Sequence, residues 1–233
     1  GLGSGDFNGD GLTDLVLGIP LIDTFSGDEG VVEVRYGAPG LGFATEADLL
    51  LQASNNGDRL GESAEGCDFN GDGIDDLAVG AVRAEDRSQT PIYTSQGAVF
   101  VYEGSSAGLE SQPDYTLFGK LPSPTGWIAQ GSGFLGWRLA AGFIDSDGYC
   151  DLVVSAWEHN SSDGVVFLYL GSSEGLLENP TQAWAHTLDG SGSEAFGRRI
   201  AVGDVNLDGL DDILIGSRTL DDPTQSGSNH GGA

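Results

Sequence analysis

The stretch GDFNGDGLTDLVLGIP, residues 5–20, places three aspartates and one asparagine between positions 6 and 14 and then becomes apolar without a break. Carboxylates this close together repel one another unless a cation lies between them. An apolar run that follows directly must enter a core. The stretch therefore predicts a cation-binding loop joined to a buried element.

The same pattern returns three more times along the chain. It reads CDFNGDGIDDLAVGAV at 67–82, GFIDSDGYCDLVVSAW at 142–157 and GDVNLDGLDDILIGSR at 203–218. With Asp6, Asp68, Phe143 and Asp204 as the first motif position, the intervals are 62, 75 and 61 residues. Self-similarity at a nearly fixed period is typical of repeat architectures.

Each repeat contains four short apolar segments bounded by Gly, Asn, Asp and Ser, the pattern of β-strands. Representative segments are 196–203 before the motif, 77–81 after it, the alternating 99–102, and the weaker 47–52, 115–118 and 184–188. No window of about 11 residues shows a helical period. Repeated four-stranded units predict an all-β fold, a β-propeller whose blades each carry the acidic loop between their first and second strands.

The repeats predict one β-propeller region over residues 1–233. Its expected parts are an incomplete blade at 1–57, blades at 58–119 and 120–190, and an incomplete blade at 191–233. The first lacks nearly all of its first strand, and the last ends where its third strand would begin. We therefore expect an arc or fragment of a larger propeller. A four-bladed ring closed by a shared terminal blade is the weaker alternative, because it would lack strands.

The acidic loop has the composition of a calcium site. In the first repeat, side-chain oxygens stand at positions 1, 3, 5 and 9, position 6 is Gly11, and position 7, Leu12, can offer its carbonyl. Ca²⁺ takes roughly 6–8 oxygen ligands in this kind of arrangement. An EF-hand would place Glu at position 12 and continue as a helix, whereas here a strand-like run follows. The same run excludes a dockerin-type loop.

An FG or LG step, the pattern DxNxDGxxD and a GAP-like step such as 18–20 together resemble the FG-GAP repeat of integrin α-subunit propellers and their bacterial relatives. The resemblance covers nearly the whole chain, four times in register. It implies a propeller, secretion to the extracellular space or cell surface, and a role in adhesion or ligand recognition. Carried over by position, it implies three complete Ca²⁺ sites: Asp6, Asn8, Asp10, Leu12 and Asp14; Asp68, Asn70, Asp72, Ile74 and Asp76; and Asp204, Asn206, Asp208, Leu210 and Asp212.

The third loop departs from this pattern. Phe143 replaces the first ligand, which leaves Asp145, Asp147, Tyr149 and Asp151 as a degenerate fourth site. We expect this site to be weak or empty. In all four loops we expect an ion that holds the blade rather than one that senses calcium.

The charge excludes some partners and leaves others open. The formal net charge is −27, from 36 acidic and nine basic residues. Nucleic acid is not expected, because phosphate binding needs clustered Lys and Arg. No apolar run is long enough to span a membrane. The chain contains no methionine, so we expect a processed product or an excised piece.

Cys67 and Cys150 fit no zinc or CxxC spacing. One disulfide or two free thiols are both compatible with the sequence. A bridge would have to join neighbouring repeats, and disulfides tolerate only a narrow range of Cα separations. We therefore favour free thiols.

An enzyme is not predicted. The pattern GxSxG occurs at 104–108 and 171–175, but a nucleophile elbow requires a strand–turn–helix context. Both copies follow the third strand of their repeat with no helix after them, so we expect turns. The three histidines form no recurrent cluster.

Three functions stay open: a calcium-stabilised extracellular module for adhesion or ligand recognition, an accessory propeller of a larger secreted enzyme, and a glycan-binding propeller. The second repeat is the longest, and its extra length falls at 83–96 and 119–134, on the face opposite the acidic loops. Exposed loops on a rigid scaffold are common binding sites. We expect a protein or glycan ligand on this face, with five candidate contact residues: Arg83, Arg87, Tyr93, Lys120 and Trp127.

Overall fold

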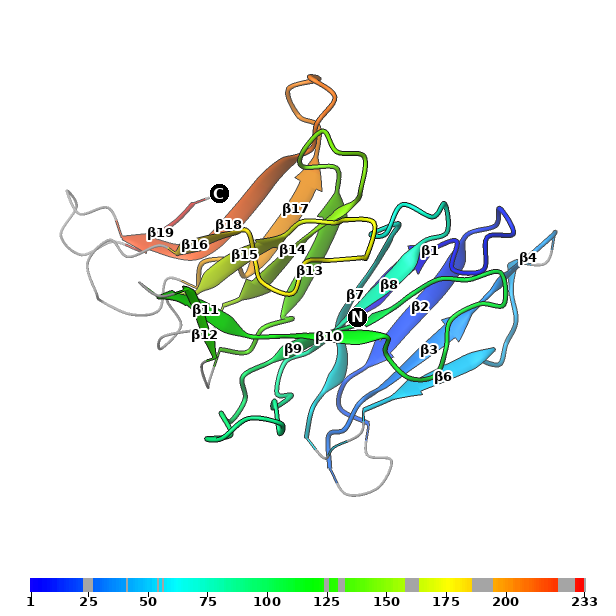
Figure 1. Cartoon of the computed structure of the whole chain (residues 1–233), viewed down its shortest axis with the longest axis horizontal. Helices are drawn as coiled ribbons and strands as arrows, with labels where there is room; N and C mark the ends of the chain where they lie inside the picture. The colour runs from blue at the N-terminus through cyan, green and yellow to red at the C-terminus, as the bar shows by residue number, and fades with distance from the viewer. Residues whose placement is uncertain are drawn as a thin grey trace.

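The computed structural model describes residues 1–22, 27–40, 42–53, 55, 57–123, 126–129, 133–157, 164–185, 195–221 and 229–232. These residues form antiparallel sheets with no helix among them, which confirms the all-β prediction. In Figure 1 the sheets lie side by side, from β1 to β6 at one end of the molecule to β17 to β19 at the other.

Each of the first three sheets contains four strands in a meander. The first comprises β1 (Leu2–Gly5), β2 (Asp14–Ile19), β3 (Val31–Arg35) and β6 (Leu49–Gln52). The second comprises β7 (Leu60–Cys67), β8 (Asp76–Ala81), β9 (Ala98–Tyr102) and β10 (Tyr115–Phe118). The third comprises β13 (Arg138–Gly142), β14 (Asp151–Ala156), β15 (Val165–Tyr169) and β16 (Gln182–Ala185).

The fourth sheet has three described strands, β17 (Arg199–Gly203), β18 (Asp212–Asp221) and β19 (Asn229–Gly232). Gly232 pairs with Ser217. The equivalent pair in the third sheet is Val165 with Ala156, and Val165 is the first residue of β15. The third strand of the fourth sheet starts three residues earlier than that position, at Asn229, because β18 and β19 also pair beyond it, Leu220 with His230 and Asp221 with Asn229.

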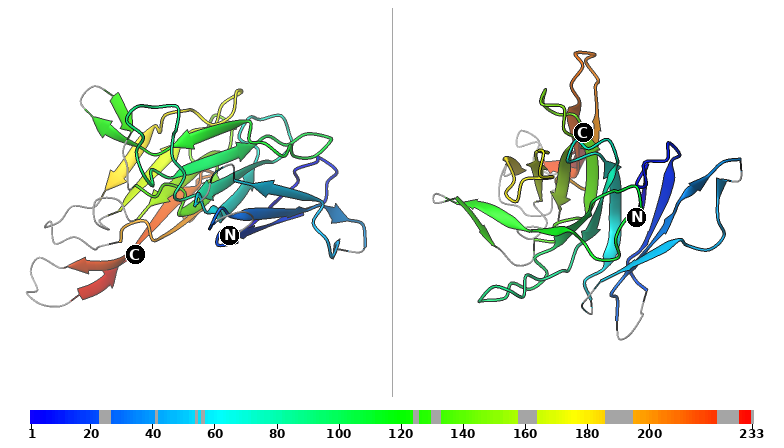
Figure 2. Two further views of the ribbon diagram at one scale, coloured as in Figure 1. Left: turned by 90° about the horizontal axis from the view of Figure 1, so that it is seen from below. Right: turned by 45° about the vertical axis from the view of Figure 1, so that its right-hand side comes forward.

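Two small hairpins stand outside the repeated sheets. They are formed by β4 (Gly37–Ala38) with β5 (Gly42–Phe43), and by β11 (Lys120–Ser123) with β12 (Gly126–Ala129). The β11–β12 hairpin extends beyond the four-stranded sheets, as Figure 2 shows. It occupies part of the long 119–134 connection, which we had expected to be a loop.

The expectation that the first sheet lacks its first strand is wrong. Leu2–Gly5 forms β1, and all four of its residues pair with β2 in one unbroken register. Only Leu2 in this segment is strongly apolar, so its sequence gives a weak strand signal. Pairing is decided instead by the neighbouring strand and by β7, against which β1 packs.

Three hydrophobic cores lie between successive sheets. Their members include Val16 and Leu77 between the first and second sheets, Val101 and Leu152 between the second and third, and Val153 and Ile213 between the third and fourth. Neighbouring residues of β14 thus face opposite cores, since side chains alternate along a strand. All six residues of β14 and of β8 are buried. This double-sided burial explains why the run after the acidic loop is continuously apolar.

The first strands of the sheets contact one another in sequence: β1 packs against β7, β7 against β13, and β13 against β17. Radial stacking of sheets about their first strands is the β-propeller arrangement. The first and fourth sheets stand at opposite ends of the molecule in Figure 1, so the ring is open. Leu214 on the fourth sheet is 58% exposed, as expected for an arc and not for a closed four-bladed ring.

Candidate metal-binding loops and the sheet junctions

The four acidic loops occupy equivalent places in the four sheets. Each connects the first strand to the second, at 6–13, 68–75, 143–150 and 204–211. They project from one edge of the arc (Figure 1). A single edge of the molecule therefore carries the repeated carboxylates.

The first loop is organised by hydrogen bonds from backbone amides to the predicted ligand side chains. The Asp6 carboxylate accepts from the amides of Asp10 at 3.0 Å and Gly11 at 2.8 Å. Asn8 Oδ1 accepts from the same Asp10 amide at 3.0 Å, and Asp10 Oδ1 accepts from Leu12 at 2.8 Å. The oxygens at positions 1 and 3 thus converge on one nitrogen.

The other two complete loops, the second and the fourth along the chain, repeat this pattern. Asp72 N donates to Asp68 and Asn70, and Asp208 N donates to Asp204 and Asn206. In both loops the glycine amide at position 6 donates to the carboxylate at position 1, and the amide at position 7 donates to the carboxylate at position 5. Three separate stretches of sequence therefore give one loop geometry.

The aspartate at position 9 lies at the start of the second strand and is turned toward the core. Asp14, Asp76 and Asp151 are buried, and each accepts from the amide at position 2 and from a glycine amide after the third strand. Burial, with a smaller contribution from the nearby Asp72 and Asp68, raises the pKa of Asp76 to about 7 against the lowering effect of the two hydrogen bonds. Burial also raises the pKa of Asp14 and Asp151.

The third loop lacks the contacts of position 1. Phe143 is 45% exposed and has no side-chain oxygen. Asp145 Oδ1 still accepts from Asp147 N, and Asp147 Oδ1 from Tyr149 N, both at 3.0 Å. The degenerate loop therefore keeps the turn but not the first ligand.

The donor set fits a hard cation, although the side chains point to backbone amides. In the part of the chain that the structure describes, no three acidic, His or Cys side chains are gathered at metal-binding distance. Every candidate donor is nevertheless an oxygen, as Ca²⁺ requires. None of the ion pairs among the described residues involves a loop carboxylate. Among the described residues, the loops thus present negative charge with no basic side chain paired to it.

Neighbouring loops are joined at a junction that repeats between sheets. The amide at position 8 donates to the carbonyl of position 1 in the preceding loop: Asp75 to Asp6 at 3.1 Å, Cys150 to Asp68 at 3.1 Å, and Asp211 to Phe143 at 2.8 Å. At the first and third junctions the position-8 carboxylate also accepts a hydrogen bond from the amide of position 1. Asp6 N donates to Asp75 at 2.8 Å, and Phe143 N donates to Asp211 at 2.9 Å.

The second junction replaces the carboxylate contact with a covalent bond. Cys67 and Cys150 form a disulfide with a Cα–Cα distance of 6.1 Å. Our expectation of free thiols is therefore wrong. The reason lies in the repeat: Cys150 stands at position 8 and Cys67 directly precedes position 1, the two places that every junction brings together.

The type of residue that precedes position 1 varies with the residue that it contacts at position 8 of the next loop. Gly5 and Gly142 precede position 1 at the junctions that use aspartate. A Cβ at Gly142 would come within 2.5 Å of the Asp211 carboxylate, and one at Gly5 within 3.1 Å of Asp75 Cβ. The added Cβ would also meet Phe7 Cε1 at 2.7 Å from Gly5 and Val202 Cγ1 at 2.5 Å from Gly142. The junctions with aspartate at position 8 thus leave little room for a side chain before position 1, whereas the disulfide replaces both residues. A position-by-position comparison of the repeats would have revealed this pairing.

The opposite ends of the strands also meet closely. A Cβ added to Gly18 or Gly80, in the GAP-like step, would overlap the carbonyl oxygen of Gly61 or Gly136, in the FG or LG step of the next sheet. The two halves of the repeated motif thus touch each other across the sheet boundary.

The five predicted ligand-face residues lie in two connections of the second repeat, the β8–β9 connection and the one that follows β10. Arg83, Arg87 and Tyr93 lie in the β8–β9 connection, and Lys120 begins β11. Lys120 Nζ lies 2.7 Å from Glu178 and 3.0 Å from Asn179, and Arg87 lies 3.4 Å from Glu85. Trp127 lies in β12, and its side chain is outside the described residues. Two of the three cations thus have partners within the protein.

Another group of basic and aromatic residues, not predicted from the sequence, lies at the starts of β13 and β17. Trp137 and Arg138 lie at the start of β13, Trp157 follows β14, and Arg198 and Arg199 lie at the start of β17. The signal was visible in LGWRLAAG at 135–142 and FGRRIAVG at 196–203, where arginines follow the LG or FG step.

The two GxSxG segments are turns, as predicted. Gly108 N donates to Ser105 O at 2.7 Å, and Gly175 N donates to Ser172 O at 2.8 Å. Each serine hydroxyl donates to the carbonyl of the same glycine at 2.7 Å.

Comparison with known families and proteins agrees with the fold. A family model for an FG-GAP-like repeat matches residues 144–215, and a model for an FG-GAP repeat matches residues 60–102. Integrin alpha pat-2 of Caenorhabditis briggsae is 30% identical over 92% of this chain and 17% of its own length. Phosphatidylinositol-glycan-specific phospholipase D of Bos taurus is 31% identical over 96% of this chain and 27% of its own length. The chain therefore spans well under a third of either relative.

Proposed function

The chain is an FG-GAP repeat, integrin alpha-like protein, and we propose that it is a calcium-binding recognition module of the extracellular space or cell surface. In this proposal the acidic loops bind Ca²⁺ at one edge of the sheets and the opposite edge carries the ligand. The observation that supports it most directly is the repeated loop geometry, in which oxygens of positions 1 and 3 share one amide in three separate loops.

The ligands proposed for the ion are those of the three complete loops. A bound Ca²⁺ supplies positive charge that offsets the carboxylates at positions 1, 5 and 9. The protein supplies the turn through the position-6 glycine, at φ values of +83°, +91° and +92° for Gly11, Gly73 and Gly209. Because adjoining loops are bonded to one another, ordering one loop also supports its neighbour.

Two observations support an extracellular location. The Cys67–Cys150 disulfide suits an oxidising environment. The relatives include integrin alpha chains. Among the described residues, no helix is long and apolar enough to cross a membrane.

A second candidate function is an accessory domain of a larger enzyme. It is supported by the similarity to phosphatidylinositol-glycan-specific phospholipase D, which covers 96% of this chain. In both candidates the role proposed for this region is recognition, without catalytic residues of its own.

Calcium is expected to stabilise the folded protein. Extracellular calcium sites have Kd values of roughly 10⁻⁴–10⁻³ M. At about 100 times Kd, one site adds about 2.7 kcal/mol to the free energy of unfolding, or roughly 5–10 °C in the melting midpoint for a chain of this size. Melting curves should be compared in about 10 mM CaCl₂ and in EGTA, with MgCl₂ at equal ionic strength as the control. An unchanged midpoint would contradict the proposal.

The third loop is expected to bind calcium least tightly, because Phe143 offers no oxygen. Calorimetric titration should therefore find three sites in the natural protein. The change Phe143→Asp restores the ligand and should add a fourth site, whereas Phe143→Leu should leave three. Because Phe143 is 45% exposed, neither change should disturb the core. Four equivalent sites in the unchanged protein would show that another group substitutes for the missing carboxylate.

A further inference from the structure

Three arginines gather at the edge of the arc opposite the acidic loops. The loops connect the end of each first strand to the start of the second. Arg138 and Arg199, by contrast, begin first strands of adjacent sheets, and Arg198 immediately precedes β17. Trp157, which follows the second strand β14, lies at the same edge. This group therefore stands away from the proposed calcium sites.

Aromatic rings hold two of these arginines in place. The guanidinium carbon of Arg138 lies 5.2 Å from the Trp137 ring centroid, and that of Arg198 lies 5.1 Å from the Trp157 centroid. The two indole rings meet edge to face at 5.2 Å. Arg138 Nη1 also donates to the Trp137 carbonyl at 2.7 Å, and Arg199 Nη1 donates to the Arg198 carbonyl at 3.1 Å. Such contacts fix the guanidinium planes, and the remaining N–H groups can bind an oxyanion.

Among the described residues, few acidic side chains lie against the three arginines. They are three of only nine basic residues in a chain with 36 acidic ones. Among the described residues, their single ion pair is Arg138 with Glu62, at a long 3.9 Å. Burial lowers the pKa of Arg138, and the charges of Arg199 and Arg198 lower it further while Glu62 opposes them. Like charges are thus held together at an energetic cost that an anionic ligand would relieve.

Two indole N–H groups add unused hydrogen-bond donors. Trp137 Nε1 and Trp157 Nε1 are buried, and neither has a hydrogen-bond partner in the part of the chain that the structure describes. Buried polar groups are normally hydrogen-bonded. Arg138 is 31% exposed, Arg198 is half-buried and Arg199 is exposed, so the guanidinium groups are open to solvent.

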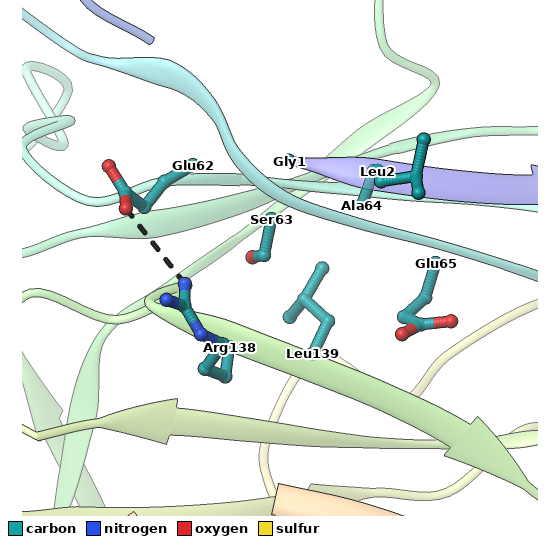
Figure 3. Close-up of a pocket in the computed structure, with 8 residues that line it drawn as sticks. All are labelled: Gly1, Leu2, Glu62, Ser63, Ala64, Glu65, Arg138 and Leu139. Atoms are coloured by element: carbon teal, nitrogen blue, oxygen red, sulfur yellow. Dashed lines mark ion pairs between the residues drawn. The ribbon is translucent and has the colours of Figure 1, made fainter. Parts of the chain in front are cut away.

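A cavity beside Arg138 limits where an anion can lie. It has a volume of about 350 Å³ and is lined by β1, β7 and β13, with Glu62 and Glu65 on its wall. In Figure 3 the Arg138 side chain points toward Glu62. Glutamates would repel an anion inside the cavity, so the favourable position lies between Arg138 and the Arg198–Arg199 pair.

We propose that Arg138, Arg198 and Arg199, supported by Trp137 and Trp157, bind a carboxylate of an acidic side chain in a partner protein. Arginine binds carboxylates through paired, charge-assisted hydrogen bonds. A single carboxylate fits better than a sulfated polysaccharide, because a long polyanion would also meet Glu62 and the strongly negative remainder of the surface. The inference rests on the proposed recognition function and assigns its ligand chemistry.

The probe for the test is the capped tripeptide acetyl-Gly-Asp-Gly-amide, compared with acetyl-Gly-Asn-Gly-amide. Its binding can be followed through the indole ¹⁵N–¹H signals of the four tryptophans, in constant calcium. We expect the Asp peptide to shift the Trp137 and Trp157 signals and the Asn peptide to leave them in place. The double change Arg198→Gln/Arg199→Gln should weaken binding by roughly tenfold or more. The matched change Arg35→Gln, at an arginine of the first sheet outside the cluster, should have no effect.

Equal shifts with both peptides, or unchanged binding after the double arginine change, would overturn the inference. Binding of a chondroitin sulfate disaccharide in place of the Asp peptide would show that the partner class is wrong. Calcium-dependent melting measured on the same samples separates the two proposals. If the peptide fails to bind while calcium still raises the midpoint, the carboxylate site alone is rejected.

Discussion

Removal of the Cys67–Cys150 disulfide is expected to lower the free energy of unfolding by about 4–5 kcal/mol. The two cysteines are separated by 83 residues, so the bond restricts a large loop of the unfolded chain. It is also the covalent member of a junction that is otherwise held by hydrogen bonds. The measurement is urea unfolding of Cys67→Ala/Cys150→Ala against the unchanged protein, both in calcium.

A reductant supplies the control for this prediction. It should lower the unfolding midpoint of the unchanged protein and leave the Cys67→Ala/Cys150→Ala variant unaffected. A difference between the two proteins below about 1 kcal/mol, well under the usual range for a disulfide, would mean that the bond constrains the unfolded chain very little.

A second pair of substitutions tests the junction rule itself. Cys67→Gly with Cys150→Asp gives the second junction the residues found at the first and third. The new carboxylate should accept from the amide of Asp68, as Asp75 does from Asp6. This variant is expected to be more stable than Cys67→Ala/Cys150→Ala, and the reverse order would contradict the rule.

The substitution Gly80→Ala is expected to destabilise the protein by on the order of 3 kcal/mol or more, as overpacking of a core does. Gly80 lies within the fully buried strand β8. An added Cβ would overlap the carbonyl oxygen of Gly136 and would lie 2.6 Å from Ser63 Oγ. Because the overlapped atom belongs to the backbone, rotation of a side chain cannot relieve it, and the second and third sheets must move apart.

The repeat provides a matched control at the same motif position. Gly216 occupies it in the fourth sheet, where a Cβ would find its nearest atom, Arg199 Cβ, at an ordinary 3.5 Å. Gly216→Ala should therefore change stability by less than about 0.5 kcal/mol, as at a typical surface position. Equal losses for Gly80→Ala and Gly216→Ala would show that strand propensity, and not sheet contact, sets the cost.

Local sequence was sufficient to predict the repeated units and their loops. Runs such as Asp76–Ala81 are short, β-branched or apolar, and bounded by turn residues, so each identifies itself as a strand without knowledge of the rest of the chain. The loop hydrogen bonds of Asp6, Asn8 and Asp10 likewise span only two to five residues. Such short-range features depend on residue order alone. The weak strand Leu2–Gly5 was missed because its pairing depends on β2 and β7 more than on its own residues.

The all-β architecture, the four repeats and the composition of the acidic loops follow from the order of the residues, because they depend on alternation, spacing and turn chemistry within single repeats. Which residues of different repeats meet depends on the packing of the sheets. It joined Cys67 to Cys150, gave Lys120 a partner in Glu178, and brought Trp137 and Arg138 beside Trp157 and Arg198. The physical reason is that these contacts depend on how closely and at what angle one sheet packs on the next, which is set by the buried side chains of both sheets together.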